Sequence, residues 1–464
     1  MTKIDLMIIP LVGVIYFLSF LDRANIGNAR LAGLQKDLNM TNHQFSVSLT
    51  VFYVPYILME IPVNLVLKRF GANITIPLMV VLWGLFSACQ GAVSTYGGLI
   101  ACRFFLGMAE GGLFPSLVLY LSNFYPRHSL QLRLSMMFSV TSLAGAFSGL
   151  LAAAIEDMNG LRGLAGWAWI FVLEGVFTVL CGILGFFLLP REPSKLRWLT
   201  RHEKAVYVEM LREDWSGDAE DEKFSWAEVW NVFLDAPHVL ILCMHFFIEG
   251  ITLFGLATFT PTIVNALGFS MTHSQLLTVP PFACSFVVSL VSAYLSDKYK
   301  RRGVTALVFS FLAIVGYAIF IGTLLAASSH ANYGALFLQI IGVYGLAPCT
   351  ATWNANNVQP HFRRATAIAF AFACTNMGGI VSTWIFIDPP RFHTASAVNV
   401  SFAIGNVIAC GGLIVYLVRR NASKRVQVAI LLREKGNGTE KGGWDSPEER
   451  QRLGDRHPRF VYTL

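Results

Sequence analysis

Charged side chains are scarce in this chain. Asp, Glu, Lys and Arg make up 14% of its 464 residues, whereas a soluble protein carries roughly 25%. Hydrophobic residues reach 55%, and the mean hydropathy is +0.55. This balance excludes an ordinary soluble domain and predicts an all-α membrane protein, because helices satisfy their own backbone hydrogen bonds in lipid. The apolar runs are continuous rather than alternating, which argues against a β-barrel.

Recognisable catalytic and metal-binding patterns are also missing. None of the eight cysteines forms a CxxC pair, so the sequence predicts neither a disulfide framework nor a metal site. It contains no HExxH, no GxSxG and no P-loop lysine. We therefore expect no enzyme activity and no cofactor. A channel is disfavoured too, because the intramembrane charges are too few to form ion-selecting rings.

The chain contains many long apolar runs. Twelve of them are predicted to span the membrane, each needing about 20 residues. They cover residues 6–28, 45–67, 74–93, 98–122, 134–155, 167–189, 238–262, 276–296, 304–327, 333–353, 366–387 and 399–419. No small-residue cleavage site follows the first run, which is therefore predicted to be a retained span.

Basic residues are distributed unevenly between the two sets of connecting loops. One set holds Lys68-Arg69, Arg127, Arg133, Lys298, Lys300 to Arg302, Arg363-Arg364 and Arg419-Arg420. The other set carries few, and the connections 94–97 and 327–332 carry no Lys or Arg. By the positive-inside rule, the basic loops, both termini and the long middle segment are cytoplasmic. The net charge of +7 is largely this topology signal and calls for no nucleic-acid partner.

The spans fall into two groups of six. Lys68 and Lys298 are 230 positions apart, as are Gly149 and Gly379. A near-constant offset predicts a duplicated unit and hence two pseudo-symmetric six-helix bundles. The predicted units are an N-terminal bundle (1–190), a cytoplasmic interdomain loop with short surface helices (191–237), a C-terminal bundle (238–420) and a flexible cytoplasmic tail (421–464).

Two acidic–basic groups lie inside predicted spans. Asp22-Arg23 follows the apolar run 6–21, which is too short to cross a membrane alone and is expected to continue as helix through the pair. Arg103 and Glu110 are seven residues apart, about two helical turns, so they share one helix face. Charges at bilayer depth are costly, and by default they mark a pathway for ions or substrate.

Several strings in the chain resemble those of known transporters. The loop Asp297-Lys298-x-x-Arg301-Arg302-Gly303 resembles the cytoplasmic signature loop of the major facilitator superfamily, and 67–71 is its degenerate first-half copy. More specific strings resemble the anion:cation symporter family, in its fungal allantoate and nicotinate permease branch. They are FLDRANIGN (20–28), RFFLGMAEGGLFP (103–115), LSNFY (121–125), LLTVPP (276–281) and NMGG (376–379). The resemblance covers about residues 5–420.

The resemblance implies a secondary active transporter with the major facilitator fold. It would take up a small organic carboxylate, such as a nicotinate-, pantothenate- or allantoate-like compound, together with protons. Arg23 would bind the substrate carboxylate, which suits a guanidinium fork. Asp22 and Glu110 would be proton sites, and Tyr56 and Asn376 would hydrogen-bond the substrate. Ion-pair or gating roles would fall to Arg103, which holds Glu110 ionised, and to Lys68, Arg69, Asp297, Arg301 and Arg302.

Each of these residues also has a structural interpretation. Arg103 and Glu110 could form a static pair that locks the fourth span to the fifth. Asp22-Arg23 could be a solvated helix end. Tyr56 and Asn376 could serve packing alone, since small residues and Asn favour close helix contacts.

Other buried ionisable residues are interpreted as structural. We expect Glu174 to pair with Arg133 or Arg103, Glu60 to brace the cytoplasmic gate near Lys68 or Arg127, and Glu249 to pair with His245, which precedes it by one helical turn. For that last pair, a second proton relay is the alternative.

Other transport modes share the expected fold. A drug or metabolite exporter and a neutral-solute facilitator are the alternatives, and fold alone does not decide between them. Arg23 beside Asp22 favours a carboxylate ligand. The expected partners are the organic anion, protons and the lipid bilayer. We expect a monomer in the plasma membrane.

Overall fold

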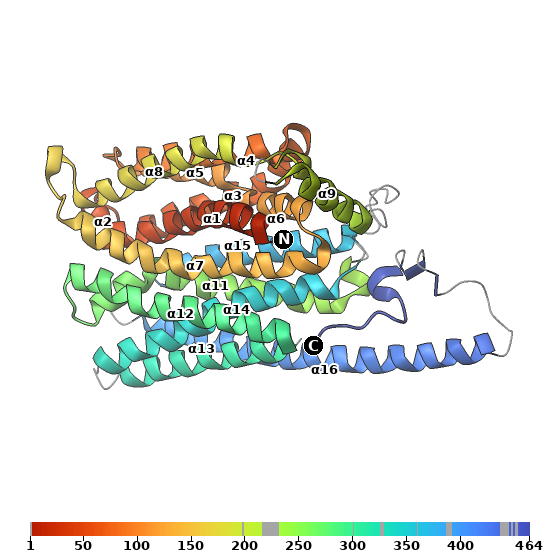
Figure 1. Ribbon diagram of the computed structural model, residues 1–464. Helices are drawn as coiled ribbons and strands as arrows, with labels where there is room; N and C mark the ends of the chain where they lie inside the picture. The colour runs from red at the N-terminus through yellow and green to blue at the C-terminus, as the bar shows by residue number, and fades with distance from the viewer. Residues whose placement is uncertain are drawn as a thin grey trace.

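The computed structural model is all-helical (Figure 1). It describes residues 2–196, 199–215, 232–299, 301–324, 329–359, 361–386, 392–436, 445–446, 449–450 and 453–464. The side chains of Lys68, Arg127 and Asp297 lie outside this description, and so does most of the second surface helix predicted before 237.

The first half of the chain forms the N-terminal bundle. Its helices are α1 (Thr2–Leu31), α2 (Leu34–Asp37), α3 (Asn42–Phe70), α4 (Ala72–Gln90), α5 (Tyr96–Glu110), α6 (Leu113–Phe124), α7 (Arg127–Glu156) and α8 (Gly166–Leu188). Helix α9 (Arg201–Trp215) follows on the predicted cytoplasmic side. The C-terminal bundle comprises α11 (Pro237–Ala266), α12 (Met271–Tyr299), α13 (Arg302–Leu324), α14 (Ser329–Asn357), α15 (His361–Ile385) and α16 (His393–Gly436).

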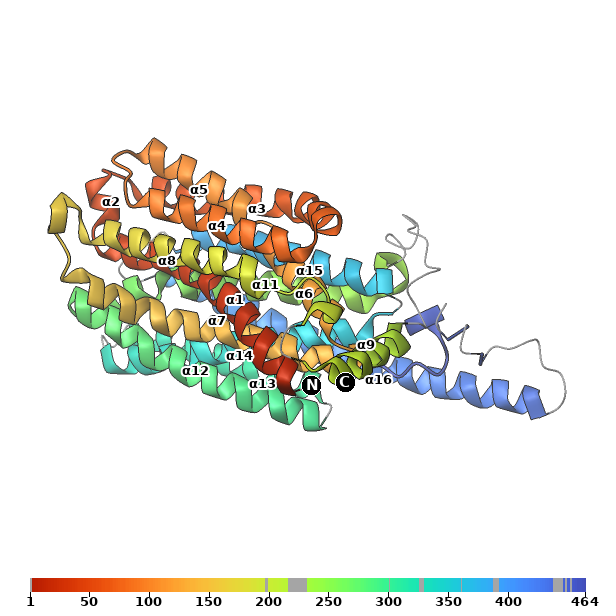
Figure 2. The same ribbon diagram turned by 45° about the horizontal axis from the view of Figure 1, so that its top comes forward.

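The spans match the pattern of apolar runs. Within the described residues, eleven helical segments are long and apolar enough to cross a membrane. The one predicted span that is not among these eleven, 45–67, lies in α3. This helix has 29 residues and is therefore about 44 Å long. That length exceeds the roughly 30 Å of a hydrocarbon core. Both chain ends lie toward the same end of the molecule, opposite α2 (Figures 1 and 2), as an even number of spans requires.

Helix packing repeats between the two bundles. Helix α1 packs on α7 as α11 packs on α15, and α4 packs on α8 as α13 packs on α16. The bundles meet where α1 contacts α11, α3 contacts α15, and α7 contacts α12 and α14. This arrangement confirms the predicted two-bundle fold and puts α1, α3, α7, α11 and α15 around the centre.

Glycines allow α1 and α11 to approach closely near the end that holds α2. A Cβ on Gly27 would lie 1.9 Å from the carbonyl oxygen of Thr258, closer than any side chain can sit. Nearby, the hydroxyl groups of Thr50 and Thr383 are 3.1 Å apart across α3 and α15, and Trp384 donates to Thr50 at 3.1 Å. The molecule is therefore closed on its predicted outer side.

The fourth span is interrupted in the middle. The prediction treated 98–122 as one helix, but α5 ends at Glu110 and α6 begins at Leu113. Gly112 has φ +84°, a left-handed conformation that glycine adopts without strain. Broken helices at membrane depth are tolerated where they line a cavity, and transporters use them at binding sites.

The end of the chain packs against the C-terminal bundle. Helix α16 continues to Gly436 and extends beyond the other helices (Figure 1). The amide groups of Asn357 and Thr463 exchange hydrogen bonds of 2.8 and 3.1 Å. Tyr462 is buried, and its backbone N–H donates to Asn421 at 2.9 Å. The flexible tail predicted over 421–464 thus contains a long helix and a docked segment, because Tyr462 supplies an apolar ring to bury.

Candidate functional site

A small cavity lies at the centre of the molecule, between the two bundles. Its volume is about 40 Å³, room for a few water molecules. The polar residues of its lining are Tyr16, Arg23, Tyr56, Glu60, Thr141, Glu249, Thr375 and Asn376. The rest is mostly aromatic. In this closed form, a carboxylate substrate would have to displace the surrounding rings.

Arg23 and Glu110 form a buried ion pair beside this cavity. The Arg23 Nη2 donates to Glu110 Oε1 at 3.0 Å, and Nε lies 3.3 Å from the same oxygen. Ser19, one turn earlier on α1, also donates to Oε1 at 2.5 Å. The exposed fractions of Arg23 and Glu110 are 8% and 0%. Glu110 Oε2 has no hydrogen-bond partner in the part of the chain that the structure describes, so the Arg23 guanidinium is engaged at one oxygen only.

Aromatic rings enclose the Arg23 guanidinium. Its central carbon lies 4.8 Å from the ring centre of Tyr56, 5.1 Å from Phe254 and 5.4 Å from both Phe20 and Phe52. These cation–π contacts come from α1, α3 and α11 and hold the side chain from both bundles. A guanidinium held in this way faces a cavity ligand in a defined direction.

Asp22 does not reach the cavity. Ser87 of α4 donates to its Oδ1 at 2.6 Å, and no described residue forms a hydrogen bond with Oδ2. Its exposed fraction is 3%. Asp22 therefore belongs to a second buried cluster inside the N-terminal bundle, where it attracts Arg103 electrostatically and repels Glu174. The helix continues through the pair as predicted, and the solvated-end interpretation is wrong.

The expected Arg103–Glu110 hydrogen bond is replaced by another pairing. Glu110 bonds to Arg23 and Ser19, whereas Nε and Nη2 of Arg103 have no hydrogen-bond partner among the residues described. Seven residues advance a helix by about 10.5 Å, so Arg23 on the crossing helix lies nearer to Glu110. Arg103 still attracts Glu110 electrostatically. Arg103 therefore interacts electrostatically with both the Arg23–Glu110 pair and the Asp22 cluster.

Tyr56 and Asn376 both line the cavity, as expected. The Asn376 amide donates to the Phe372 carbonyl at 3.1 Å, which leaves its oxygen available to a ligand. Close packing belongs to its neighbour Gly378, whose Cβ would lie 2.2 Å from the Phe247 carbonyl oxygen. The binding and packing roles of this string therefore fall on different residues.

The predicted gating residues are remote from the cavity. Arg69 and Arg301 are exposed, and the Arg69 guanidinium lies 5.6 Å from the ring centre of Phe70. Arg302 is buried, and its backbone N–H donates to the Leu464 carbonyl at 2.7 Å. These groups are at the predicted cytoplasmic end, where a gate would be.

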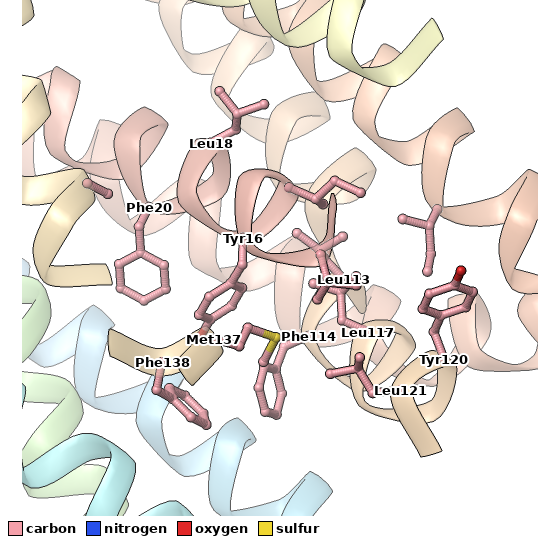
Figure 3. Packing of buried hydrophobic residues seen from close by; sticks show 14 of the residues in the cluster. Tyr16, Leu18, Phe20, Leu113, Phe114, Leu117, Tyr120, Leu121, Met137 and Phe138 are labelled. Carbon is pink, nitrogen blue, oxygen red and sulfur yellow. The ribbon is translucent and has the colours of Figure 1, made fainter. Parts of the chain in front are cut away.

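An aromatic layer separates the cavity from that cytoplasmic end. Figure 3 shows Tyr16 beside Phe114, Met137 and Phe138. The ring centres of Phe114 and Phe372 are 3.7 Å apart, and those of Phe138 and Phe372 are 5.7 Å apart. Phe372 lies on α15 and the others on the N-terminal bundle, so this layer joins the two bundles and must part if the cavity opens inward.

One predicted structural pair has different partners, and the other forms no hydrogen bond among the described residues. His245 bonds to Asn406, and Glu249 accepts a hydrogen bond from Thr350 at 2.7 Å. They share a helix face, but helices α16 and α14 offer each a nearer partner. Arg133 bonds to Asp5 at 2.7 Å, so Glu174 is left near Arg103, and neither of its oxygens is hydrogen-bonded to a described residue.

Sequence reasoning missed three polar contributors to the site. Ser19 precedes Arg23 by one helical turn on α1, a spacing that could have identified it. Ser87 lies in an apolar run without any distinguishing pattern. Glu60 was assigned to the gate but lines the cavity, because α3 places it one turn below Tyr56.

The chain is similar in sequence to several fungal transporters. It is 33% identical to an uncharacterized transporter of Schizosaccharomyces pombe over 432 residues, which cover 92% of this chain and 85% of that protein. It is 30% identical to the high-affinity nicotinic acid transporter of Saccharomyces cerevisiae over 464 residues, covering 99% and 84% of the two chains. An MFS-type transporter of Hormonema carpetanum is 32% identical over 412 residues, covering 88% and 83%.

Solved transporter structures share the fold. The xylose transporter of Escherichia coli, in a partially occluded inward-open conformation, matches with a TM-score of 0.65 at 13% identity, covering 85% of this chain and 96% of that one. A bacterial homologue of the human lysosomal transporter Spinster matches with a TM-score of 0.63 at 17% identity, covering 88% and 94%. The sequence model of the major facilitator superfamily matches residues 12–383. This chain is therefore a multi-pass membrane transporter that belongs to the major facilitator superfamily.

Proposed function

We propose that this transporter takes up a small organic carboxylate together with protons. The observation that carries the proposal is the buried Arg23–Glu110 pair at the central cavity, with a distance of 3.0 Å. It is a cation that can bind a carboxylate, held by an acid that can accept a proton. Both functions of a proton-coupled anion carrier thus meet at one contact.

Coupling follows from competition for the guanidinium. When a substrate carboxylate binds Arg23, Glu110 loses the charge that keeps it ionised in a dry environment. It then takes a proton, and Ser19 remains as a hydrogen-bond partner. When the proton leaves, ionised Glu110 reclaims Arg23 and expels the anion. Substrate and proton therefore move together.

Asp22 and Arg103 influence this exchange electrostatically, without contacting the substrate. Arg103 attracts both Asp22 and Glu110, so protonation of one acid changes the field at the other. We assign Glu110 as the proton site in contact with Arg23, and Asp22 as a second proton site inside the N-terminal bundle. Tyr56 and Asn376 supply hydrogen bonds to the substrate, and the basic cytoplasmic loops carrying Arg69, Arg301 and Arg302 act at the gate.

The lining favours a compact substrate with a flat apolar part. Phe20, Phe254 and Phe372 line the cavity together with Tyr16 and Tyr56, and such rings stack well on planar groups. The relative from Saccharomyces cerevisiae is a nicotinic acid transporter, which supports a nicotinate-like anion ahead of pantothenate- or allantoate-like ones. We propose that the protein acts as a monomer, since one chain encloses the cavity. We also propose that it lies in the plasma membrane.

Uptake in cells that express this chain tests the proposal. Radiolabelled nicotinate, pantothenate and allantoate are offered at several external pH values, with and without a protonophore. We expect at least one anion to accumulate, more strongly as the external pH falls, and the protonophore to abolish accumulation. Uptake that ignores the proton gradient, or that is confined to neutral solutes, would refute the proposal.

A further inference from the structure

A second carboxylate, Glu249 of α11, lines the cavity from the C-terminal bundle. Its exposed fraction is 3%, and Thr350 of α14 donates to its Oε2 at 2.7 Å. At the next residue, Gly250, helices α11 and α15 are in close contact, because a Cβ there would lie 2.0 Å from the Thr375 carbonyl oxygen. This contact fixes the backbone position of Glu249. Glu249 therefore stands on a tight α11–α15 crossing and not on a mobile segment.

Among the described residues, the groups that face Glu249 include no free cation. Tyr16 from α1 and Cys410 from α16 interact with it electrostatically, and α14 and α15 provide the neutral groups Thr350 and Asn376. Helix α12 contributes no described residue to the lining. Within the described residues, Arg23 is the one cation at the cavity, and Glu110 already binds it. An isolated ionised carboxylate is too costly to bury in such surroundings, so Glu249 needs a proton.

The balance of charges around the cavity indicates that Glu249 must also be protonated when an anion binds. The cavity wall offers the single positive charge of Arg23 against the acids Glu249 and Glu60, with Glu110 directly behind it. An anionic substrate would add a further negative charge to the same small volume. We propose that Glu249 is a further proton-coupling residue, the one carried by the C-terminal bundle, and that it must hold a proton for an anion to occupy the cavity. This inference rests on the function proposed above.

The position of Glu249 suggests how its proton leaves. Phe246, one turn toward the predicted cytoplasmic side, packs on Phe372 of the aromatic layer with ring centres 5.5 Å apart. When that layer parts, water reaches Glu249 and accepts its proton. The ionised carboxylate then repels the substrate anion toward the open side. One proton taken up from outside on Glu249 is released inside with the anion, in addition to the proton that Glu110 carries.

Flux ratios in proteoliposomes test this role. Purified wild-type protein, Glu249→Gln and His245→Gln are supplied with radiolabelled nicotinate, pantothenate and allantoate, and proton and anion fluxes are measured together. We expect Glu249→Gln to move one proton fewer per anion while it still exchanges anion for anion. His245→Gln, which changes the same helix one turn away at a residue bonded to Asn406, is expected to keep the wild-type ratio.

The outcomes separate the two proposals. If wild-type protein accumulates an anion with protons and Glu249→Gln keeps the same flux ratio, the role of Glu249 is refuted and the proposed function stands. If wild-type protein accumulates none of the anions, both are refuted. Infrared difference spectra of wild-type minus Glu249→Gln protein give a substrate-independent readout. We expect the carbonyl band of a protonated carboxylic acid near neutral pH, and its absence would also refute the proposal.

Discussion

Asp22 and Arg23 are neighbours on α1, but their side chains belong to two separate charge clusters. Arg23 binds Glu110 beside the cavity at 3.0 Å, whereas Asp22 accepts a hydrogen bond from Ser87 inside the N-terminal bundle at 2.6 Å. Successive helical residues point about 100° apart, which explains the division. Helix α1 is thus the wall between the substrate cation and a buried acid, and any rotation of α1 changes both environments.

The first prediction concerns the shape of the cation at position 23. Arg23→Lys keeps the charge but loses the planar fork and its stacking on Tyr56. We expect the apparent affinity for the transported carboxylate to fall about tenfold, which corresponds to about 1.4 kcal/mol, with little change in the amount of protein at the membrane. Initial uptake rates against substrate concentration measure this. An unchanged affinity would show that the fork does not bind the carboxylate.

The second prediction identifies the partner of Glu110. Removing one member of a buried ion pair costs about 3–5 kcal/mol, so Glu110→Gln or Arg23→Gln alone should lower the amount of folded protein. We expect the double variant Arg23→Gln with Glu110→Gln to restore it, although transport stays absent. The matched double variant Arg103→Gln with Glu110→Gln leaves the charge of Arg23 unpaired, so it should restore less of the folded protein. Fluorescence size-exclusion profiles compare the two, and the reverse order would favour the Arg103–Glu110 pairing.

The third prediction tests Asp22 as a proton site. Asp22→Asn keeps the size of the side chain and can still accept the hydrogen bond from Ser87, so the protein should fold. We expect it to lose concentrative uptake and to keep exchange of anion for anion. Ser87→Ala serves as the control, since it removes the donor but leaves the acid. Normal accumulation by Asp22→Asn would make Asp22 a structural residue.

The fourth prediction concerns closure at the outer end. A Cβ on Gly27 would lie 1.9 Å from the Thr258 carbonyl oxygen, so Gly27→Ala should keep α1 and α11 apart and abolish transport. Gly13→Ala on the same helix is the control, because its Cβ would meet its nearest neighbour, Val140, at 3.9 Å. We expect uptake near the wild-type rate for that control. Equal uptake by both variants would show that α1 and α11 need not close.

The fold was predictable from the sequence because span length depends on local properties. An apolar run must be about 20 residues long to cross a bilayer, and the run 6–21 could reach that length only by continuing through Asp22-Arg23. Burial of both side chains in α1 confirms this reasoning. The positions of Tyr56 and Asn376 at the cavity agree with the motif resemblance.

Side-chain pairing could not be predicted in the same way. Sequence spacing places Arg103 and Glu110 on one face, but the crossing of α1 over α5 decides that Arg23 reaches Glu110 first. The same limit explains Glu249, whose partner Thr350 is 101 positions away. The break at Gly111-Gly112 was missed because a glycine pair is equally compatible with close helix packing, and the choice depends on neighbouring helices.

The exchange of Glu110 between Arg23 and a proton is the central step of the proposed transport cycle. The direct measurement uses Glu110→Gln protein in proteoliposomes, corrected for the amount of folded protein, with a radiolabelled anion that the wild-type protein accumulates. Gln cannot ionise, so it cannot compete with substrate for Arg23. We predict that anion exchange persists, while accumulation driven by an inward proton gradient disappears. Proton-driven accumulation at the wild-type level in this variant would contradict the account.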